Sequence, residues 1–297
     1  MERPDEPEAA GLFETHRGML RAVAYRMLGS LDEADDAVQE AWLRLHRTGA
    51  GDVDNLAGWL RTVVTRICLD MLRSRSSRRE DLAEQHVLDE LSDPGRWSPP
   101  EDEALLADSV SRALLVVLDT LSPAERIAFV LHDMFAVPFD RIAPMVERTP
   151  VATKKLASRA RHKVRGTPLV PASELAGNRQ VVSAFLAAAR AGDLTAIRAV
   201  LAPDVVRRAD PAAVPPGGTA EVRGARAVAE GTAALAGRSQ FAELALVNGT
   251  VGAVLAPRGR LLLALTFTVV DEMITAYDVI ADPARLRELD IAVLPQP

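Results

Sequence analysis

The sequence predicts a multidomain chain in which two all-helical units are followed by one α+β unit. Apolar residues recur at helical spacing over about residues 12–80 and again over about 104–165. Between these stretches, the segment SDPGRWSPPED holds Pro and Gly residues that interrupt helices. From about residue 241 onward, segments rich in Val, Leu and Thr alternate with turn signals, which is typical of antiparallel strands. The length of 297 residues is sufficient for about two or three compact units.

The composition argues against a generally basic nucleic-acid coat, because the formal net charge is −6. Cys68 is the single cysteine, which excludes an intramolecular disulfide, and its apolar neighbours Ile67 and Leu72 favour a core position. The acidic start MERPDEPEAAG is unlike a signal peptide. No apolar run approaches the roughly 20 residues that a membrane span needs. We therefore expect a cytoplasmic protein without a membrane segment.

The first helical unit contains a helix with an acidic outer face, LDEADDAVQEAWLRLHR at residues 31–47. Its apolar side consists of Ala34, Val38, Ala41 and Leu45. Acids near a helix N-terminus are favoured by the helix dipole, which explains part of the pattern. The dipole does not require so many exposed acids, so we expect a docking surface for a basic partner helix. The polar residues of this expected docking surface are Asp32, Glu33, Asp35, Asp36, Gln39 and Glu40.

A polar loop, TGAGDVDN at residues 48–55, leads into a helix with a basic end. Asn55 is a suitable N-cap for this helix. Between residues 61 and 79 the sequence holds six arginines and one acid, Asp70. A loop beside a basic helix can hold single-stranded nucleic acid. Trp42 and Trp59 fit core positions better than base-stacking positions.

The segment VPFDRIAPMVERTPVATKKLASRARHKVR at residues 137–165 predicts two short helices joined by a tight turn. Thr149 is a good N-cap and Pro150 a good first residue for the second helix. Its apolar stripe consists of Leu156, Ala160 and Val164. Residues 148–165 hold seven basic residues and no acid, which suits the DNA major groove, although an ordinary solvated basic helix is the alternative. The residues expected to point away from the stripe are Thr153, Lys154, Ser158, Arg159, Arg161 and His162.

After a short linker, two helices are expected over residues 178–202. Turn signals at Asn248-Gly249 and Pro257-Arg258-Gly259 then predict about two or three antiparallel strands between residues 241 and 280. A desolvated carboxylate could act there as a general base. The candidates, each of which fits a solvated charge better, are Asp204, Asp210, Asp271, Glu272 and Asp278. We expect no catalysis, no cofactor and no metal, and we leave open an apolar pocket for a small effector.

Together these motifs resemble bacterial RNA polymerase sigma factors of the extracytoplasmic-function (ECF) group. AYRMLGSLDEADDAVQEAWLRLHR with NLAGWLRTVVTRICLDMLRSR resembles region 2, which binds core polymerase and the −10 element. LSPAERIAFVLHDMFAVPFDRIAPMVERTPVATKKLASRARHKVR resembles region 4, which binds the −35 element. The resemblance implies region 2 over residues 12–80, a linker over 81–107, region 4 over 108–166 and a second linker over 167–177.

The resemblance also implies partners and contact residues. The partners are promoter DNA and core RNA polymerase, through its β′ clamp coiled coil and its β flap. The residues implied to contact the clamp are Asp35, Asp36, Gln39 and Glu40. Those implied to bind the −10 element are Asn55, Arg61, Arg66, Arg73 and Arg75. Those implied to contact the −35 element are Thr153, Lys154, Lys155, Ser158, Arg159, Arg161 and His162.

Residues 178–290 are similar to SnoaL-like domains, which are cone-shaped α+β folds. The similarity lies in NRQVVSAFLAAARAGDLTAIRAVLAPDVV and EVRGARAVAEGTAALA, whereas VPPGG and ADPARL depart from the usual motifs. In the region 4 segment, Glu147 departs from the sigma-factor pattern, because the turn of similar sigma factors usually has Gly at this position. The resemblance implies an intramolecular contact with the sigma regions and regulation in cis. The alternative is a stand-alone helix-turn-helix regulator with a ligand-sensing last domain. Such a protein needs neither the acidic helix over residues 31–47 nor the basic helix that follows the polar loop over residues 48–55.

Overall fold

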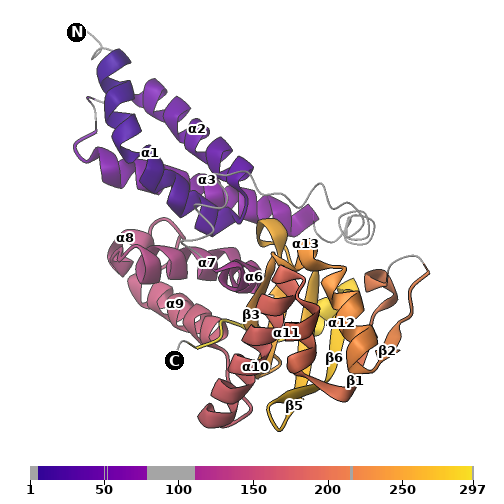
Figure 1. Cartoon of the computed structure of the whole chain (residues 1–297). Helices are drawn as coiled ribbons and strands as arrows, with labels where there is room; N and C mark the ends of the chain where they lie inside the picture. The colour runs from indigo at the N-terminus through magenta and orange to yellow at the C-terminus, as the bar shows by residue number, and fades with distance from the viewer. Residues whose placement is uncertain (1–5, 50, 52, 79–110, 215–216, 296–297) are drawn as a thin grey trace. The chain divides into compact units, whose positions relative to one another are not determined.

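The structure, a computed structural model, describes residues 6–49, 51, 53–78, 111–214 and 217–295 (Figure 1). It divides into two compact units. The first comprises Met1–Asp81 and Leu118–His162, and the second comprises Leu82–Val117 and Lys163–Pro297. The predicted linker over residues 81–107 lies outside the described residues.

The first unit begins with a helical bundle (Figure 1). Its helices are α1 (Glu6–Leu28), α2 (Leu31–Thr48) and α3 (Leu56–Arg78), and each packs against the other two. Ser30 is the N-cap of α2, because its hydroxyl accepts the Glu33 N–H at 3.4 Å. Gly49 ends α2 with a φ of 89°, a region that favours glycine. The helices predicted over residues 31–47 and from residue 56 onward are confirmed.

The interior of this bundle is apolar. Leu20, Leu45 and Leu60, one from each helix, are at most 1% exposed. Cys68 is also fully buried, and burial raises the pKa of its thiol to about 12. Cys68 is therefore a core residue, as the sequence predicts.

The first unit continues through short helices, and the first and last of these along the chain extend into the second unit. These are α6 (Arg112–Thr120), α7 (Pro123–Phe129), the π-helix η3 (Val130–Met134), α8 (Phe139–Ile142) and α9 (Pro150–Arg165). Ser122 and Glu125 form a capping box at the start of α7, in which each side chain accepts the backbone N–H of the other. At the start of α9, the Ala152 N–H donates to Thr149 Oγ1 at 3.2 Å. The predicted Thr149-Pro150 start of α9 is thus confirmed.

A buried arginine joins α1 and α7 within the first unit. Arg126 is 2% exposed. Its Nε donates to the Arg26 carbonyl oxygen at 3.4 Å, and its Nη1 donates to Asp119 at 3.3 Å. A buried guanidinium is costly unless its N–H groups find acceptors. These contacts therefore stabilise α7 against α1.

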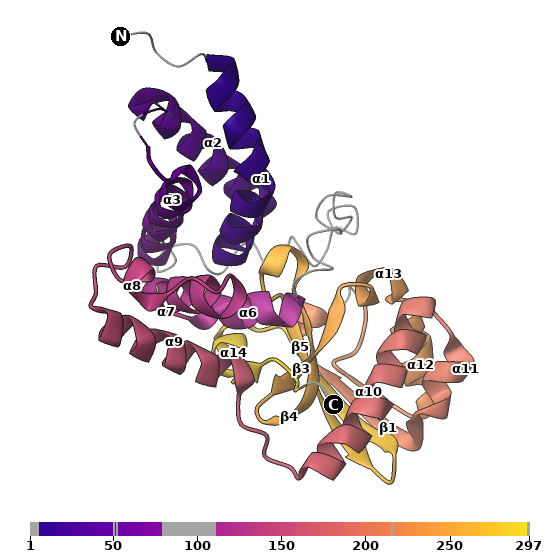
Figure 2. The same cartoon turned by 90° about the vertical axis from the view of Figure 1, so that its left-hand side faces the viewer.

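The second unit is a sheet with most of its helices packed on one face (Figures 1 and 2). Leu286 of its last helix packs instead with Ala264 and Ile280, whose side chains lie on the opposite face. The strand order is β2-β1-β6-β5-β4-β3-β7, with β1 parallel to β6 and the other neighbours antiparallel. The strands are β1 (Leu201–Ala209), β2 (Glu221–Arg223), β3 (Ala242–Val247), β4 (Thr250–Leu255), β5 (Leu263–Val270), β6 (Met273–Ile280) and β7 (Ile291–Ala292). The helices are α10 (Ala172–Ala191), α11 (Leu194–Ala199), α12 (Ala225–Ala233), α13 (Ala236–Ser239) and α14 (Pro283–Glu288), with 3₁₀ turns η4 (Pro211–Ala213) and η5 (Pro257–Gly259).

The core of the second unit lies between α10 and the sheet. Phe185 and Leu186 of α10 are each 2% exposed. The Phe185 ring centroid lies 5.5 Å from that of Tyr277 on β6. The Tyr277 hydroxyl is hydrogen-bonded to Thr232 of α12 at 3.0 Å, and burial raises the pKa of this phenol. These contacts fix α10 and α12 on the same face of the sheet.

Two hairpins follow the turn signals in the sequence. Asn248 and Gly249, with φ of 49° and 74°, join β3 to β4, and η5 joins β4 to β5. A third hairpin joins β5 to β6 through Asp271 and Glu272, with φ of 49° and 62°. This hairpin is not predicted from the sequence, because Asp-Glu is not a strong turn dipeptide. Strand β1 is not predicted either, because its partner β6 lies far away in the sequence.

The second linker is shorter than predicted, because α10 begins at Ala172, directly after Pro171. Residues 172–177 are therefore helical. The residues before this linker also belong to the second unit. The Val293 N–H donates to the carbonyl oxygen of Val164 at 2.9 Å. Gly166 follows with a φ of 57°, and a Cβ there would clash with Ala292 of β7.

Candidate nucleic-acid interface

The buried side of α9 confirms the predicted stripe and widens it. Leu156, Ala160 and Val164 are each at most 9% exposed. Thr153 is predicted to point outward, and this prediction is wrong, because the residue is 0% exposed. Its hydroxyl donates to the Thr149 carbonyl oxygen at 3.0 Å. Ala157, one turn later, is also fully buried, so Thr153 belongs to the side of α9 that faces the core.

Two arginines of α9 are paired with acids from the preceding helices. Arg159 Nε lies 3.3 Å from Glu125 Oε1, and Arg161 Nη2 lies 2.7 Å from Asp133 Oδ1. Arg159 keeps 65% of its side chain exposed, whereas Arg161 keeps 34%. Arg161 is therefore the less accessible of the two to an added ligand.

The remaining polar face of α9 is open. Its exposed residues include Val151, Lys154, Lys155, Ser158 and His162. No acid lies within ion-pair distance of Lys154 or Lys155 in the described part of the chain. These two lysines can therefore meet an added anion without first breaking an ion pair.

The turn before α9 contains an acid with a strained backbone. Glu147 has a φ of 56°, in the left-handed region where glycine is favoured. Its Oε2 lies 3.7 Å from Arg73 Nη2 on α3. Both side chains are at least half exposed, so this ion pair adds little stability. It nevertheless places an acid beside one of the arginines that the resemblance assigns to the −10 element.

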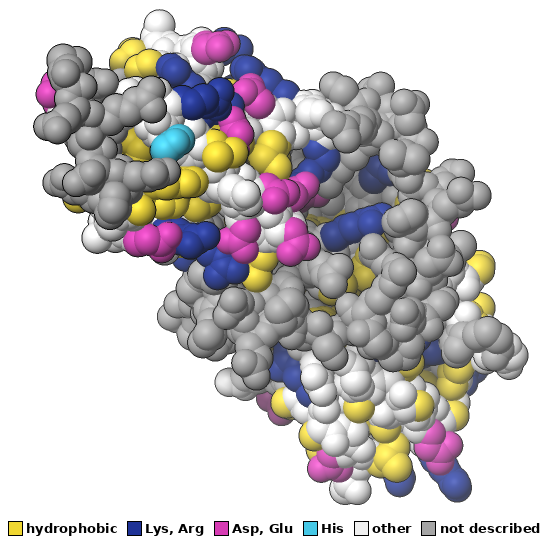
Figure 3. Space-filling view, turned by 90° about the horizontal axis from the view of Figure 1, so that it is seen from above, with side chains coloured by type: hydrophobic (Ala, Val, Ile, Leu, Met, Phe, Trp, Pro, Cys, Tyr) yellow, Lys and Arg dark blue, Asp and Glu magenta, His cyan; other side chains and the backbone are white. Residues whose placement is uncertain are grey.

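The acidic residues of α2 do not form one unpaired surface. Asp35 accepts hydrogen bonds from Nε and Nη2 of Arg21 at 2.7 and 3.0 Å. Glu40 pairs with two arginines nearer the end of α2. Asp36 and Gln39 are exposed, and Asp36 has no ion-pair partner among the described residues. Figure 3 likewise shows acidic and basic side chains interspersed over the visible part of the bundle.

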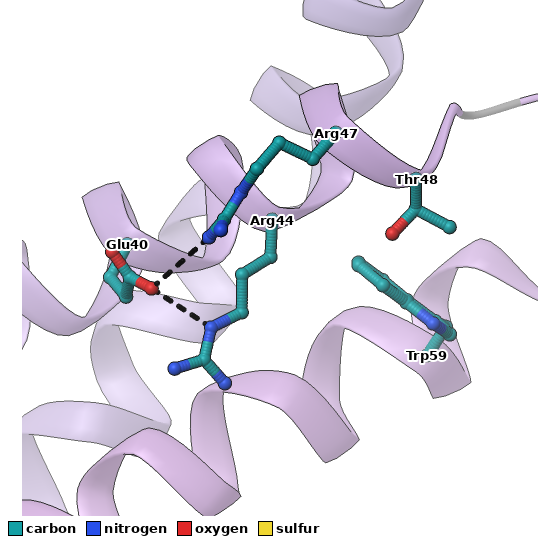
Figure 4. A pocket seen from close by; sticks show the side chains of 5 residues that line it. All are labelled: Glu40, Arg44, Arg47, Thr48 and Trp59. Atoms are coloured by element: carbon teal, nitrogen blue, oxygen red, sulfur yellow. Dashed lines mark hydrogen bonds and ion pairs between the residues drawn. The ribbon is translucent and has the colours of Figure 1, made fainter.

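An open pocket of about 460 Å³ lies where α2 ends and α3 begins. It is lined by Glu40, Arg44, Arg47, Thr48 and Trp59. The Glu40 carboxylate accepts from Arg44 Nε at 2.9 Å and lies 3.5 Å from Arg47 Nη2 (Figure 4). Trp59 is half-buried and faces Thr48 across the pocket, contrary to the core position that the sequence predicts (Figure 4). Its place in the first turn of a basic helix, directly after a polar loop, is the signal that identifies it.

The other residues assigned to the −10 element differ in accessibility. Asn55 caps α3, because its Oδ1 accepts a first-turn N–H at 2.9 Å. Arg66 is exposed, and Arg61 is half-buried with an Nε that has no acceptor among the described residues. Arg75 donates to a carbonyl oxygen at the end of α1 at 3.0 Å and pairs with Glu33 of α2. Arg75 thus also holds the bundle together.

Comparison with known proteins assigns the chain to a family. A family model for Sigma-70 region 2 matches residues 12–78. The chain is 39% identical over 213 residues to the probable ECF RNA polymerase sigma factor SigI of Mycobacterium tuberculosis, covering 71% of this chain and 72% of the relative. The chain belongs to the ECF RNA polymerase sigma factor family.

The ECF sigma factor SigJ of Mycobacterium tuberculosis is a further relative. It is 38% identical over 247 residues, covering 81% of this chain and 79% of the relative. The crystal structure of SigJ aligns with a TM-score of 0.46 at 32% identity, covering 96% of this chain and 100% of that chain.

The family assignment confirms two predictions. This ECF sigma factor is not an enzyme. Its fold class is also as predicted, with a helical sigma region followed by a helix-and-sheet domain. In the described parts of the chain, no helix is long and apolar enough to cross a membrane, and no three His, Cys, Asp or Glu residues are grouped as metal ligands.

Asp210 differs from the solvated charge that the sequence predicts, because it is 7% exposed. Its Oδ2 accepts the backbone N–H groups of Ala281 and Asp282 at 2.9 and 3.0 Å. Its Oδ1 pairs with Arg285 of α14. Asp210 therefore ties the end of β1 to the segment after β6, and this sigma factor uses the carboxylate for structure.

Proposed function

We propose that this ECF sigma factor docks on core RNA polymerase through α2 and directs it to promoters by binding the −10 element with α3 and the −35 element with α9. The observation that carries the proposal is the open basic face of α9, where Lys154 and Lys155 are exposed and have no ion-pair partner among the described residues. Because the polymerase and the DNA are cytoplasmic partners, we place the protein in the cytoplasm.

For polymerase docking, we assign the central contact to Asp36 and Gln39, which are exposed on α2. Their partner is the β′ clamp coiled coil, as the family resemblance implies, and the helices around α9 contact the β flap. Asp35 already pairs with Arg21, and Glu40 already pairs with Arg44. Those two carboxylates contribute less to docking, because each must exchange an existing partner for a new one.

For the −10 element, we assign the first captured nucleotide to the pocket that Figure 4 shows. A base can stack on Trp59, and its phosphate can approach Arg44 and Arg47, the combination that single-stranded nucleic-acid sites use. Arg66 and Arg61 extend the basic surface along α3.

For the −35 element, we assign the contacts to the open face of α9. Lys154, Lys155, Ser158 and His162 lie on it, and Arg159 borders it. Thr153 supports the helix from inside and does not contact DNA.

Run-off transcription with purified core polymerase tests the proposal. Promoters are first selected from random DNA by the holoenzyme formed with the full chain. Lys154→Ala combined with Lys155→Ala should lower initiation, whereas Arg198→Ala, which removes an exposed charge on α11, should not. A stand-alone regulator would bind its DNA equally well without core polymerase and would support no initiation, and that result would refute the proposal.

We also infer regulation in cis, because the second unit contains both ends of the region 4 segment. At one end, the Ala113 N–H of α6 donates to Glu243 Oε2 of β3 at 3.0 Å. At the other end, Val164 of α9 accepts from Val293. A conformational change in the sheet domain can thus alter region 4 through α6 and α9.

Two variants test this regulation. Deleting residues 168–297 removes both contacts and should change promoter-dependent transcription strongly in one direction. Glu243→Ala removes only the acceptor of the Ala113 N–H and should change transcription in the same direction, with Glu288→Ala as the matched exposed control. Equal activity of the truncated and full-length proteins, at equal stability, would contradict regulation in cis.

A further inference from the structure

Val151 is an apolar residue in a polar setting. It is 68% exposed, although it is the second residue of α9 and large aliphatic side chains are most often buried. A single exposed valine is ordinary on a protein surface and carries no meaning by itself. Its neighbours on the helix make it informative.

The residues three, four and seven positions after Val151 lie on the same side of α9. They are Lys154, Lys155 and Ser158, all exposed. The two lysines have no ion-pair partner among the residues that the structure describes. Val151 therefore stands at the N-terminal end of a face made for an anionic partner, and not on an apolar patch.

We propose that Val151 determines sequence specificity by packing against the 5-methyl group of a thymine in the −35 element. The inference rests on the proposed binding of the −35 element by α9. In the major groove, thymine is distinguished by its methyl group, which contacts apolar side chains. The N-terminal residues of a recognition helix are the ones that contact base edges. Val151 lies in this first turn, and the lysines behind it can contact the phosphates.

The charge of the face favours DNA over an apolar protein surface as the occupant. A protein that covered Val151 would also desolvate Lys154 and Lys155, which is costly without matching acids. DNA supplies both a methyl group and phosphates within one groove. The face thus matches a thymine-containing duplex in both shape and charge.

The test is a double-mutant cycle that combines truncation of Val151 with removal of one thymine methyl group from the promoter. Holoenzyme formed with the full chain is titrated with a selected promoter in which deoxyuridine replaces each thymine of the −35 element in turn, on either strand. Uracil pairs as thymine does and lacks only the methyl group. At one position we expect wild-type affinity to fall about 4-fold, the effect of one buried methyl group.

The Val151→Ala holoenzyme should bind the thymine promoter about 4-fold more weakly and should not respond to uracil at that position. Alanine is a better helix former than valine, so the variant should keep its fold, and its Tm is measured to confirm this. Val270→Ala, which truncates a valine that is 50% exposed at the end of β5, is the matched control and should keep the uracil response.

The outcomes separate the two proposals. If Lys154→Ala does not weaken promoter binding, α9 does not contact the −35 element and the proposed function fails with it. If Lys154→Ala weakens binding but Val151→Ala responds to uracil at every position as the wild type does, the assignment of Val151 is overturned while α9 keeps its role. Loss of the uracil response in Val151→Ala alone supports the proposal.

Discussion

Reversing the charge of Asp36 should strongly weaken polymerase docking without disturbing the fold, whereas reversing Asp35 should disturb both. The two residues are neighbours on α2 and both are exposed. Asp35, however, forms a bidentate pair with Arg21. The single variant Asp36→Arg is therefore a cleaner test of docking than a double variant that includes Asp35.

The structure sets the expected magnitudes. The Arg21–Asp35 pair, whose side chains are 26% and 51% exposed, contributes about 0–1 kcal/mol after solvent screening. Asp35→Arg loses this pair and adds a repulsion of about 1 kcal/mol with Arg21. The free energy of unfolding should thus fall by about 1–2 kcal/mol. Asp36→Arg loses no ion pair and should change it by less than about 0.5 kcal/mol.

Fluorescence anisotropy with labelled sigma factor and unlabelled core polymerase measures the docking affinity. Asp36→Arg should weaken it at least about tenfold, because like charges facing each other across an interface are strongly unfavourable. Asp204→Arg, an exposed charge reversal on β1, is the matched control and should bind core as the wild type does. Wild-type affinity of Asp36→Arg, with an unchanged urea midpoint, would refute the assignment of α2 as the docking surface.

Three further predictions follow from individual contacts. Lys154→Ala should weaken promoter binding by the holoenzyme by about 1–3 kcal/mol if Lys154 contacts a base edge. Arg161→Ala should weaken promoter binding less, because Asp133 already holds Arg161. Equal losses of affinity for the two variants in a promoter titration would contradict this. Asp210→Ala should destabilise the second unit by about 2–4 kcal/mol, because buried N–H groups lose their acceptor; unchanged hydrogen exchange in β6 would show otherwise. Cys68 should resist iodoacetamide at pH 8 in the native protein, since burial raises the pKa of its thiol to about 12. The free energy of unfolding should fall as pH rises from about 9 to 12, because only the thiol of the unfolded chain ionises in that range. Rapid labelling of the native protein would contradict the burial of Cys68.

Features set by local sequence were predictable. The Thr149-Pro150 start of α9 and the Asn248-Gly249 hairpin depend on the backbone preferences of the residues themselves. The buried position of Cys68 follows from helical spacing. Each of these signals lies within a few residues of the structure that it determines.

Features that depend on distant residues were not predictable. Thr153 is buried because the side of α9 that faces the core is wider than one stripe. The pairing of Arg161 with Asp133 joins residues 28 positions apart, and nothing in either local sequence indicates it. Strand β1 lies parallel to β6 across more than 60 residues of chain, so its Pro- and Arg-containing sequence carries no hairpin signal.

The backbone at Gly166 has a consequence for anyone who exchanges domains between sigma factors. Its φ of 57° and the closeness of Ala292 mean that a bulkier residue at this joint would be both strained and crowded. A chimera cut directly after Gly166 would separate this glycine from the β7 segment that fits it, even though the cut falls in an apparent linker. Grafts that keep residues 163–297 together, with the cut placed before Lys163 and the donor's own glycine retained, should give soluble hybrids more often than grafts cut at residue 167.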